Sequence, residues 1–340
     1  MKITRIKIMN LRAIAELELD LTAGENSPLD LVVLAGSNGC GKTSVLEACL
    51  WALNQDALPD RVPPKPYDLI ELDIEDQGQQ YRIKRSPESH LIQSGNSQSM
   101  VFPKKGLPTG LKAKVLYFSS WRAPRLIGSV PLSMGKGKRP TARPPDALWR
   151  LKQHLINLTG ASAIGGFRQV QAVTAPELIE RMMELWREFY PGAKSRFEVR
   201  VAAGQRANLT IAYYAGPLEN EAEEDLTFDL FLFDKDHPQG VAIDDLSSGE
   251  LAVLSMIGAF LLERTPYDLV LIDEPELHLH PAWHRTMINV LRKALPKSQL
   301  ICATHSEHIL DAVYSHERFT LLNKADPRLR LVPEEMATRA

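Results

Sequence analysis

The chain has 340 residues, of which 44% are hydrophobic and 24% are charged, and its formal net charge at pH 7 is −2. This composition is ordinary for a globular protein, and the small net charge excludes a general electrostatic attraction to nucleic acid or to an anionic membrane. The three cysteines (Cys40, Cys49 and Cys302) have no paired spacing, which argues against a disulfide framework and favours a reducing compartment. The longest apolar run, 251–262, is too short to span a bilayer, so we expect a soluble cytoplasmic protein without membrane contact.

The first predicted elements are two strands at 2–9 and 14–20, where apolar and polar side chains alternate. Residues 31–35 (LVVLA) are all apolar, which is typical of a strand buried on both faces of a parallel sheet. A helix is expected to follow from about Lys42 to Leu53. The chain therefore opens with a strand pair and then a strand–loop–helix unit.

The loop of this unit has the spacing G-x-x-x-x-G-K-T. Between a strand and a helix, this spacing is typical of a phosphate-binding loop, because glycines let backbone N–H groups approach phosphate oxygens at a helix N-terminus. We expect Lys42 to reach the β- and γ-phosphates of a nucleotide, and the Thr43 hydroxyl to coordinate Mg²⁺. ATP and Mg²⁺ are thus the predicted cofactors, bound at Gly36, Ser37, Asn38, Gly39, Cys40, Gly41, Lys42 and Thr43.

The middle of the chain, residues 54–243, is predicted to be an inserted lobe of mixed α+β structure. Its expected strands are 68–74, 80–85, 115–118, 196–202, 208–214 and 228–233, and its expected helices are 146–158 and 176–190. Of these, 115–118 (VLYF) is expected to join the core sheet. Prolines throughout the lobe exclude a long coiled coil, because a proline inside a helix costs about 3 kcal/mol.

A basic, Gly- and Pro-rich stretch at 134–145 is predicted to be a loop. Two interpretations stay open for it: a solvated loop, or a DNA-binding element whose phosphate contacts would depend strongly on salt. The basic residues concerned are Lys104, Lys105, Lys136, Lys138, Arg139 and Arg143. DNA is therefore kept as a candidate partner.

The last third of the chain alternates helices and strands, which predicts a parallel sheet with crossovers. The expected helices are 249–264, 281–295 and 306–313, and the expected strands are 269–272, 299–303 and 318–322. The strand at 269–272 delivers Asp273 and Glu274 to the carboxyl end of the sheet, where open α/β sheets bind ligands. We expect Asp273 in the Mg²⁺ shell and Glu274 as the general base that activates water, with a helix N-cap acid as the alternative.

Three further patterns accompany this carboxylate pair. A serine- and glycine-containing turn opens the helix at 249–264, and a helix N-terminus is itself an anion site. The residues of this turn are Leu246, Ser247, Ser248, Gly249 and Glu250. His305 follows a strand and is placed to meet a γ-phosphate or the attacking water. His278, His280 and His284 have a spacing that could suggest zinc, but neither a cysteine nor a fourth ligand lies nearby.

In this order, the phosphate loop, LSSGE, LVLIDEPELHLHP and ATHS resemble the Walker A, signature, Walker B with D-loop, and switch-histidine motifs of the ABC-type ATPases. ELHLHP and the opening KIMNLRAIAELELDL place the resemblance with the soluble SMC, Rec-type and OLD-like ATPases. The first 50 residues contain no Phe, Trp or Tyr to stack adenine, so Arg12 becomes the candidate for that contact. The family's Q-loop glutamine has no match, and Ser120, Arg122 and His280 are kept as further site candidates.

The resemblance implies an α/β fold of the ABC-type P-loop NTPases, with a mostly parallel central sheet, N-terminal antiparallel strands and the mid-chain α+β insertion. It implies an ATPase core at 1–53 and 244–325 and a C-terminal tail at 326–340. Two copies would sandwich ATP head to tail, so that the 246–250 turn of one copy completes the site of the other.

The implied function is a Mg²⁺-dependent ATPase switch that controls a partner in DNA repair or anti-phage defence. Because the sequence shows no nuclease motif, an effector such as a nuclease is expected to be encoded separately. The alternative is the nucleotide-binding subunit of a membrane transporter.

Overall fold

The computed structural model describes residues 1–24, 27–53, 68–95, 97–100, 113–120, 130–131, 147–164, 175–201, 227–262 and 266–322. They fall into two compact units. The first comprises Met1–Trp121, Thr265–Leu277 and Met287–Ala340, and the second comprises Arg122–Arg264 and His278–Thr286. The predicted strand at 208–214, the basic loop at 134–145 with Lys104 and Lys105, Arg122 and the tail at 326–340 lie outside the described residues.

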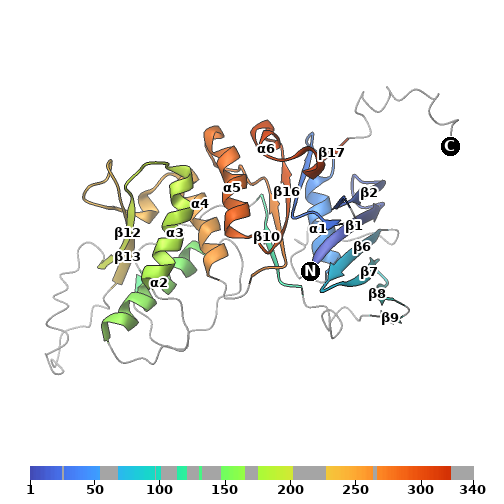
Figure 1. Ribbon diagram of the computed structural model, residues 1–340, viewed down its shortest axis with the longest axis horizontal. Coiled ribbons are helices and arrows are strands. Elements are labelled where there is room, and N and C mark those ends of the chain that lie inside the picture. Colours follow the sequence, from blue (N-terminus) through green and yellow to red (C-terminus); the bar gives the residue numbers. More distant parts are fainter. Residues whose placement is uncertain are drawn as a thin grey trace. The chain divides into compact units, whose positions relative to one another are not determined.

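A five-stranded parallel sheet lies at the centre of the first unit (Figure 1). In spatial order its strands are β10 (Val115–Phe118), β15 (Leu269–Asp273), β16 (Gln299–Thr304), β5 (Leu31–Gly36) and β17 (Arg318–Leu321). Every pairing between neighbours is parallel. β15 and β16 are buried along their whole length, which explains the apolar runs at 269–272 and 300–303. The predicted α/β fold with a parallel central sheet is confirmed.

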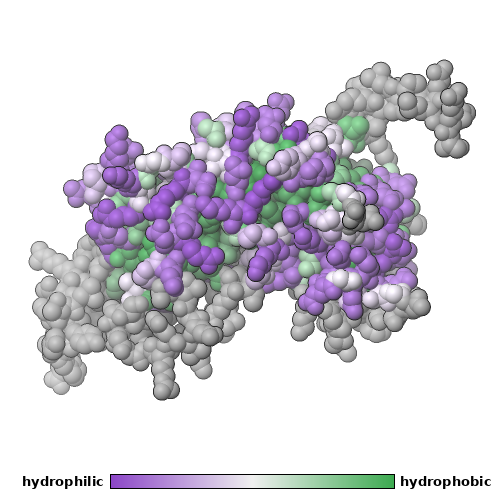
Figure 2. All heavy atoms as spheres, in the orientation of Figure 1, coloured by the Kyte–Doolittle hydropathy of each residue, from purple (hydrophilic) through white to green (hydrophobic). Residues whose placement is uncertain are grey.

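The first unit also contains a six-stranded antiparallel sheet. Its strands in spatial order are β2 (Glu16–Asp20), β1 (Lys2–Met9), β6 (Leu69–Asp76), β7 (Gln79–Arg85), β8 (His90–Ser94) and β9 (Ser97–Met100). Helix α1 (Lys42–Ala52) contacts strands of both sheets, and one hydrophobic cluster joins them. The other face of the antiparallel sheet is polar, and Figure 2 shows hydrophilic residues over these strands.

The second unit combines helices with a small antiparallel sheet. Its helices are α2 (Ala147–Ile164), α3 (Ala175–Phe189) and α4 (Ser248–Leu261), and its strands are β11 (Val130–Pro131), β12 (Arg196–Val201), β13 (Thr227–Phe233) and β14 (Val241–Ala242). α2 and α3 both pack on α4. The apolar stripe of α3 is buried, from Leu178 through Met182 and Trp186 to Phe189. No helix in the described ranges is long and apolar enough to cross a membrane.

A two-stranded sheet pairs β3 (Thr22–Ala23) with β4 (Ser27–Pro28), and further elements lie in the C-terminal third. A short 3-10 turn, Pro281–Trp283, precedes α5 (His284–Ala294), and α6 (Glu307–Asp311) lies between β16 and β17. Most predicted strands and helices therefore occur within a few residues of their expected bounds. Strands β8 and β9 were not predicted, because each is only four or five residues long and mixes polar with apolar side chains.

The compact units do not follow the boundaries expected at 53 and 244. Strands β6 to β9 belong to the first unit because β6 pairs with β1 along nearly its whole length. Helix α4 belongs to the second unit because its buried face packs on α2 and α3. Because β1 and β6 lie far apart in the sequence, local sequence patterns do not reveal that they pair.

Candidate functional site

The loop between β5 and α1 approaches its neighbours closely. A side chain at Gly36 would place its Cβ only 2.3 Å from the Leu321 carbonyl oxygen, so only glycine fits there. Gly41 precedes α1 in a left-handed conformation, and no side chain caps the helix. The first N–H groups of α1 are therefore left to bind an anion at the positive end of the helix dipole.

Lys42 is buried at the start of α1, with 5% of its surface exposed. Its Nζ donates to the carbonyl oxygens of Gly36 at 2.9 Å and Ser37 at 3.1 Å, and lies 3.5 Å from His305 Nδ1. Within the described part of the chain, no carboxylate comes within ion-pair distance of Lys42. The Lys42 ammonium is thus positioned by neutral groups and is not neutralised by a carboxylate in the described ranges, as a group that binds phosphate requires.

Thr43 and Asp273 meet at the carboxyl end of the parallel sheet. The Thr43 hydroxyl donates to both carboxylate oxygens of Asp273, at 3.0 and 3.2 Å, and Asp273 is only 2% exposed at the end of β15. A hydroxyl and a carboxylate are oxygen ligands of the kind Mg²⁺ uses, with waters and phosphates completing the shell. The residues present therefore fit Mg²⁺.

Glu274 and His305 lie next to this pair. Glu274 has a φ of 52°, which is uncommon for a residue with a side chain, and its N–H donates to the Ala303 carbonyl at 2.7 Å. That bond ties the end of β15 to β16, and the Glu274 carboxylate oxygen then lies 4.0 Å from His305 Nε2. Both side chains are 34% exposed, so water can reach the Glu274 carboxylate and the His305 ring.

Glu276 was not among the predicted site residues, yet it contacts the His305 loop directly. Its Oε1 accepts hydrogen bonds from the Thr304 hydroxyl at 2.6 Å, the His305 N–H at 3.0 Å and the Ser306 N–H at 3.2 Å. The only sequence signal for this role is an acid two residues after Glu274, which alone does not distinguish it from a surface glutamate.

The serine-containing turn lies in the second unit, where Ser247 caps α4. Ser247 and Glu250 form a capping box, with Glu250 Oε2 accepting from the Ser247 N–H at 2.9 Å. Tyr190 donates to the other Glu250 oxygen at 2.6 Å, and burial together with this carboxylate raises the pKa of Tyr190. Ser247 and Ser248 are exposed, while Leu246 and Gly249 are buried. The two serines at the N-terminus of α4 are thus accessible from outside the unit.

Gly249 is required by its surroundings. A Cβ at this position would lie 2.8 Å from the His278 carbonyl oxygen, which belongs to the same unit. His280, one of the further candidates, caps the 3-10 turn by accepting from the Ala282 N–H at 3.2 Å. His284 Nε2 lies 3.3 Å from the Leu279 carbonyl oxygen. Among the described residues, no group of three or more His, Cys, Asp or Glu side chains is placed to hold a metal, so the zinc spacing does not assemble into a site there.

Arg12 forms an ion pair with Glu47, which is buried on α1. A hollow of about 370 Å³ lies nearby, lined by residues 13–19, Gly39, Cys40 and residues 320–322, none of them aromatic. Ser120 follows the carboxyl end of β10 and is half-buried. The predicted roles of Arg12 and Ser120 stay predictions.

Two family models match the chain. Residues 5–106 match an "AAA domain", and residues 144–311 match an "AAA domain, putative AbiEii toxin, Type IV TA system". The first match includes the 36–43 loop with its flanking strand and helix. The second includes the 246–250 turn, Asp273, Glu274 and His305. They support an AAA-type ATPase.

The similarity of the chain to two known proteins also supports an ATPase. The "Retron Vc95 probable ATPase" of Vibrio cholerae is 37% identical over 103 residues, which cover 27% of this chain and 20% of that protein. The "Septu protein PtuA" of Bacillus mycoides is 20% identical over 334 residues, which cover 95% of this chain and 41% of that protein. The chain thus spans less than half the length of either relative. Neither comparison supports the transporter alternative.

Among solved structures, the SMC head domain from Thermotoga maritima is similar to this chain. It superposes with a TM-score of 0.49 and 13% sequence identity, and the alignment covers 92% of each chain.

Proposed function

We propose that the chain is a Mg²⁺-dependent ATPase switch that closes into a head-to-tail homodimer around ATP and controls a separately encoded effector. The observation that carries this proposal is the convergence of Lys42, the Thr43–Asp273 pair and the Glu274–His305 pair at the carboxyl edge of one parallel sheet. Cation, metal ligands and base are the groups that phosphoryl transfer to water needs. Residues 1–53 and 244–325 act together as the ATPase core.

Each of these residues has a distinct role in the proposed site. The 36–43 loop and the N-terminus of α1 bind the phosphates, and Lys42 neutralises the charge of the β- and γ-phosphates. Thr43 and Asp273 hold Mg²⁺, which supplies further charge neutralisation when bound. Glu274 accepts the proton of the attacking water, and His305 contacts the γ-phosphate. The hollow beside Gly39 and Cys40 takes the nucleoside.

The homodimer follows from the 246–250 turn. Ser247 and Ser248 are exposed at the N-terminus of α4, an anion site that a γ-phosphate bound to a second copy would fill. In this arrangement each site combines the phosphate loop of one copy with the Ser247–Gly249 turn of the other. ATP then drives closure and hydrolysis drives opening, because only the triphosphate bridges both copies.

The partner is proposed to be an effector encoded by another gene, such as a nuclease, acting in anti-phage defence or DNA repair. Similarity to a retron ATPase and to a Septu protein supports the defence setting.

The Glu274→Gln variant tests the proposal directly. Glutamine keeps the shape and hydrogen bonding of Glu274 but cannot accept a proton, so hydrolysis should fall by at least about 10² while ATP binding persists. The variant should therefore accumulate as a dimer in saturating Mg-ATP, measured by size-exclusion chromatography with multi-angle scattering. A variant that hydrolyses ATP like the wild type would reject Glu274 as the base, and one that stays monomeric would reject the homodimer.

A mixing experiment tests whether the sites are shared between copies. Ser247→Arg blocks closure at the site it completes, and Lys42→Ala prevents ATP binding at its own site. A mixed dimer of the two variants has one site with both lesions and one site with neither. Recovery of ATPase activity on mixing is expected, and activity no greater than the sum of the separate variants would contradict shared sites.

A further inference from the structure

The Glu276 carboxylate joins two loops that carry different parts of the proposed site. Glu276 follows Glu274 by two residues, in a turn closed by a hydrogen bond from the Leu277 N–H to the Glu274 carbonyl at 2.9 Å. Its Oε1 accepts from Thr304, His305 and Ser306, the residues that lead from β16 into α6. The loop that carries the base and the loop that carries the histidine are therefore bonded through one side chain.

The two oxygens of this carboxylate have very different surroundings. Oε1 takes all three hydrogen bonds, whereas Oε2 is buried and has no hydrogen-bond partner among the described residues. Buried carboxylate oxygens are normally satisfied, so a glutamate kept in this position points to a requirement for Oε1. The Ser306 N–H also donates to the Thr304 hydroxyl at 2.9 Å, which makes the histidine loop a small network centred on Oε1.

We propose that Glu276 is a positioning residue for ATP hydrolysis, which holds the His305 backbone so that the imidazole stays between Lys42 and Glu274. This inference rests on the proposed ATPase function. The His305 ring lies 3.5 Å from Lys42 Nζ and 4.0 Å from Glu274 Oε1, and Glu276 bonds the backbone N–H of that same histidine. In this role Glu276 acts through His305, whose backbone N–H it bonds.

The geometry separates positioning from simple stabilisation of the fold. Among the described residues, Glu276 forms no hydrogen bond or ion pair with Lys42, the 36–41 loop or α1, so loss of Glu276 should leave ATP binding intact while His305 moves. A displacement of about 1 Å in a group that acts on the reaction can reduce turnover by up to about 10². We therefore expect removal of the Glu276 side chain to lower kcat without lowering the affinity for ATP.

Glu276→Ala, Glu276→Gln and the control Glu307→Ala test this role in the full-length chain. We expect Glu276→Ala to lower kcat at least about tenfold, with KM for ATP and the Kd of a fluorescent ATP analogue within about twofold of the wild type. Glutamine keeps a carbonyl oxygen in the place of Oε1 and loses no hydrogen bond at Oε2, so Glu276→Gln should keep at least about a third of wild-type kcat. Glu307 is exposed on α6, two residues after His305, and its removal should change neither constant.

Thr304→Val supplies a second route if Glu276→Ala does not fold. Valine keeps the volume of this fully buried residue and removes one of the three donors to Oε1, so kcat should fall by about two- to fivefold with unchanged ATP affinity. The inference is overturned if Glu276→Ala, or Thr304→Val in its place, turns over like the wild type, or if kcat, ATP affinity and melting temperature fall together. A wild-type chain without ATPase activity would instead overturn the proposed function, and this inference with it.

Discussion

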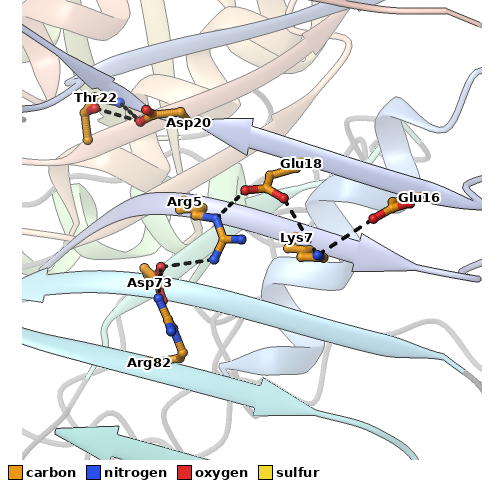
Figure 3. A network of polar contacts seen from close by, with 8 residues as sticks. All are labelled: Arg5, Lys7, Glu16, Glu18, Asp20, Thr22, Asp73 and Arg82. Carbon is orange, nitrogen blue, oxygen red and sulfur yellow. Dashed lines mark hydrogen bonds and ion pairs between the residues drawn. The ribbon is translucent and has the colours of Figure 1, made fainter. Parts of the chain in front are cut away.

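Two regions of the first unit differ in the partners of their charged side chains. On the polar face of the antiparallel sheet, acidic and basic side chains pair across neighbouring strands (Figure 3), and Asp73 lies directly opposite both Arg5 and Arg82 in the strand register. Arg5 contacts Glu18 at 2.8 Å and Asp73 at 3.3 Å, and Asp73 contacts Arg82 at 2.6 Å. We call this set the ion ladder. Each of its charges is neutralised by a side chain of a neighbouring strand.

At the carboxyl edge of the parallel sheet, charges are held mainly by neutral groups. The Lys42 ammonium is bonded by two backbone carbonyls, and the Asp273 carboxylate by the Thr43 hydroxyl. Such partners fix position without cancelling charge, so an incoming phosphate or metal ion still finds the full electrostatic interaction. The contrast teaches what distinguishes the two regions: the charges of the ion ladder have charged partners, whereas the Lys42 ammonium is bonded by backbone carbonyls.

The largest expected effect comes from a comparison in which one lysine of each region is replaced by alanine. Lys42→Ala should weaken ATP binding by at least about 100-fold, because the phosphates lose a buried cation. Lys84→Ala removes a β7 lysine that is 44% exposed and pairs with Glu71 of the neighbouring strand β6 at 2.8 Å, and it should leave ATP affinity within about twofold of the wild type. Calorimetric titration of both variants measures the difference. Nucleotide affinity of Lys42→Ala close to that of the wild type would reject the phosphate-loop assignment.

A second comparison uses two aspartates. Asp273→Asn should raise the Mg²⁺ concentration needed for half-maximal ATPase activity by about 10- to 100-fold, because an amide is a poorer metal partner than a carboxylate. Asp73→Asn alters the ion ladder and should leave the Mg²⁺ requirement unchanged. ATPase activity titrated with Mg²⁺ measures both. Equal Mg²⁺ requirements in the two variants would remove Asp273 from the metal site.

Much of this contrast could be predicted from the sequence. The G-x-x-x-x-G-K-T spacing between an apolar strand and a helix, and the acids after LVLI, are local patterns whose geometry follows from the elements that flank them. The structure brings Lys42, Thr43, Asp273, Glu274 and His305 of these motifs together at one edge of a sheet. Their roles in nucleotide chemistry stay predictions.

What the sequence could not provide are contacts that depend on register and on distant pairing. The ion ladder requires β1 to lie between β2 and β6, which are separated by about fifty residues of chain. Glu276 and the Tyr190–Glu250 hydrogen bond depend on which loops meet in space. The structure pairs Arg12 with Glu47, a contact that a sequence pattern does not reveal, and the expected role of Arg12 at the nucleotide stays a prediction.

The smallest effect is expected where the ion ladder is weakened, and it should depend on pH. Burial tends to raise the pKa of Asp73, but Arg82 and Arg5 outweigh burial and lower it below the ordinary value of 3.8. A carboxyl whose pKa is lower in the folded than in the unfolded state stabilises the fold above the unfolded value, and this contribution is lost as pH falls through the folded pKa. Arg82→Ala should therefore lower the free energy of unfolding at pH 7, and the deficit should shrink below about pH 3.8.

The size of that deficit is limited by solvent. Arg82 is 47% exposed, and pairs of this kind contribute about 0.2–1 kcal/mol, so Arg82→Ala should lose no more than about 1 kcal/mol at pH 7. Hydrogen exchange at β6 and β7 amides, measured at several pH values, reports the local change that global unfolding of a two-unit chain would blur. Arg187→Ala is the matched control, because Arg187 is also 47% exposed and pairs with a glutamate, Glu180, in the second unit. A deficit at β6 and β7 that stays constant or grows on acidification would show that Arg82 acts through its packing and not through the charge of Asp73.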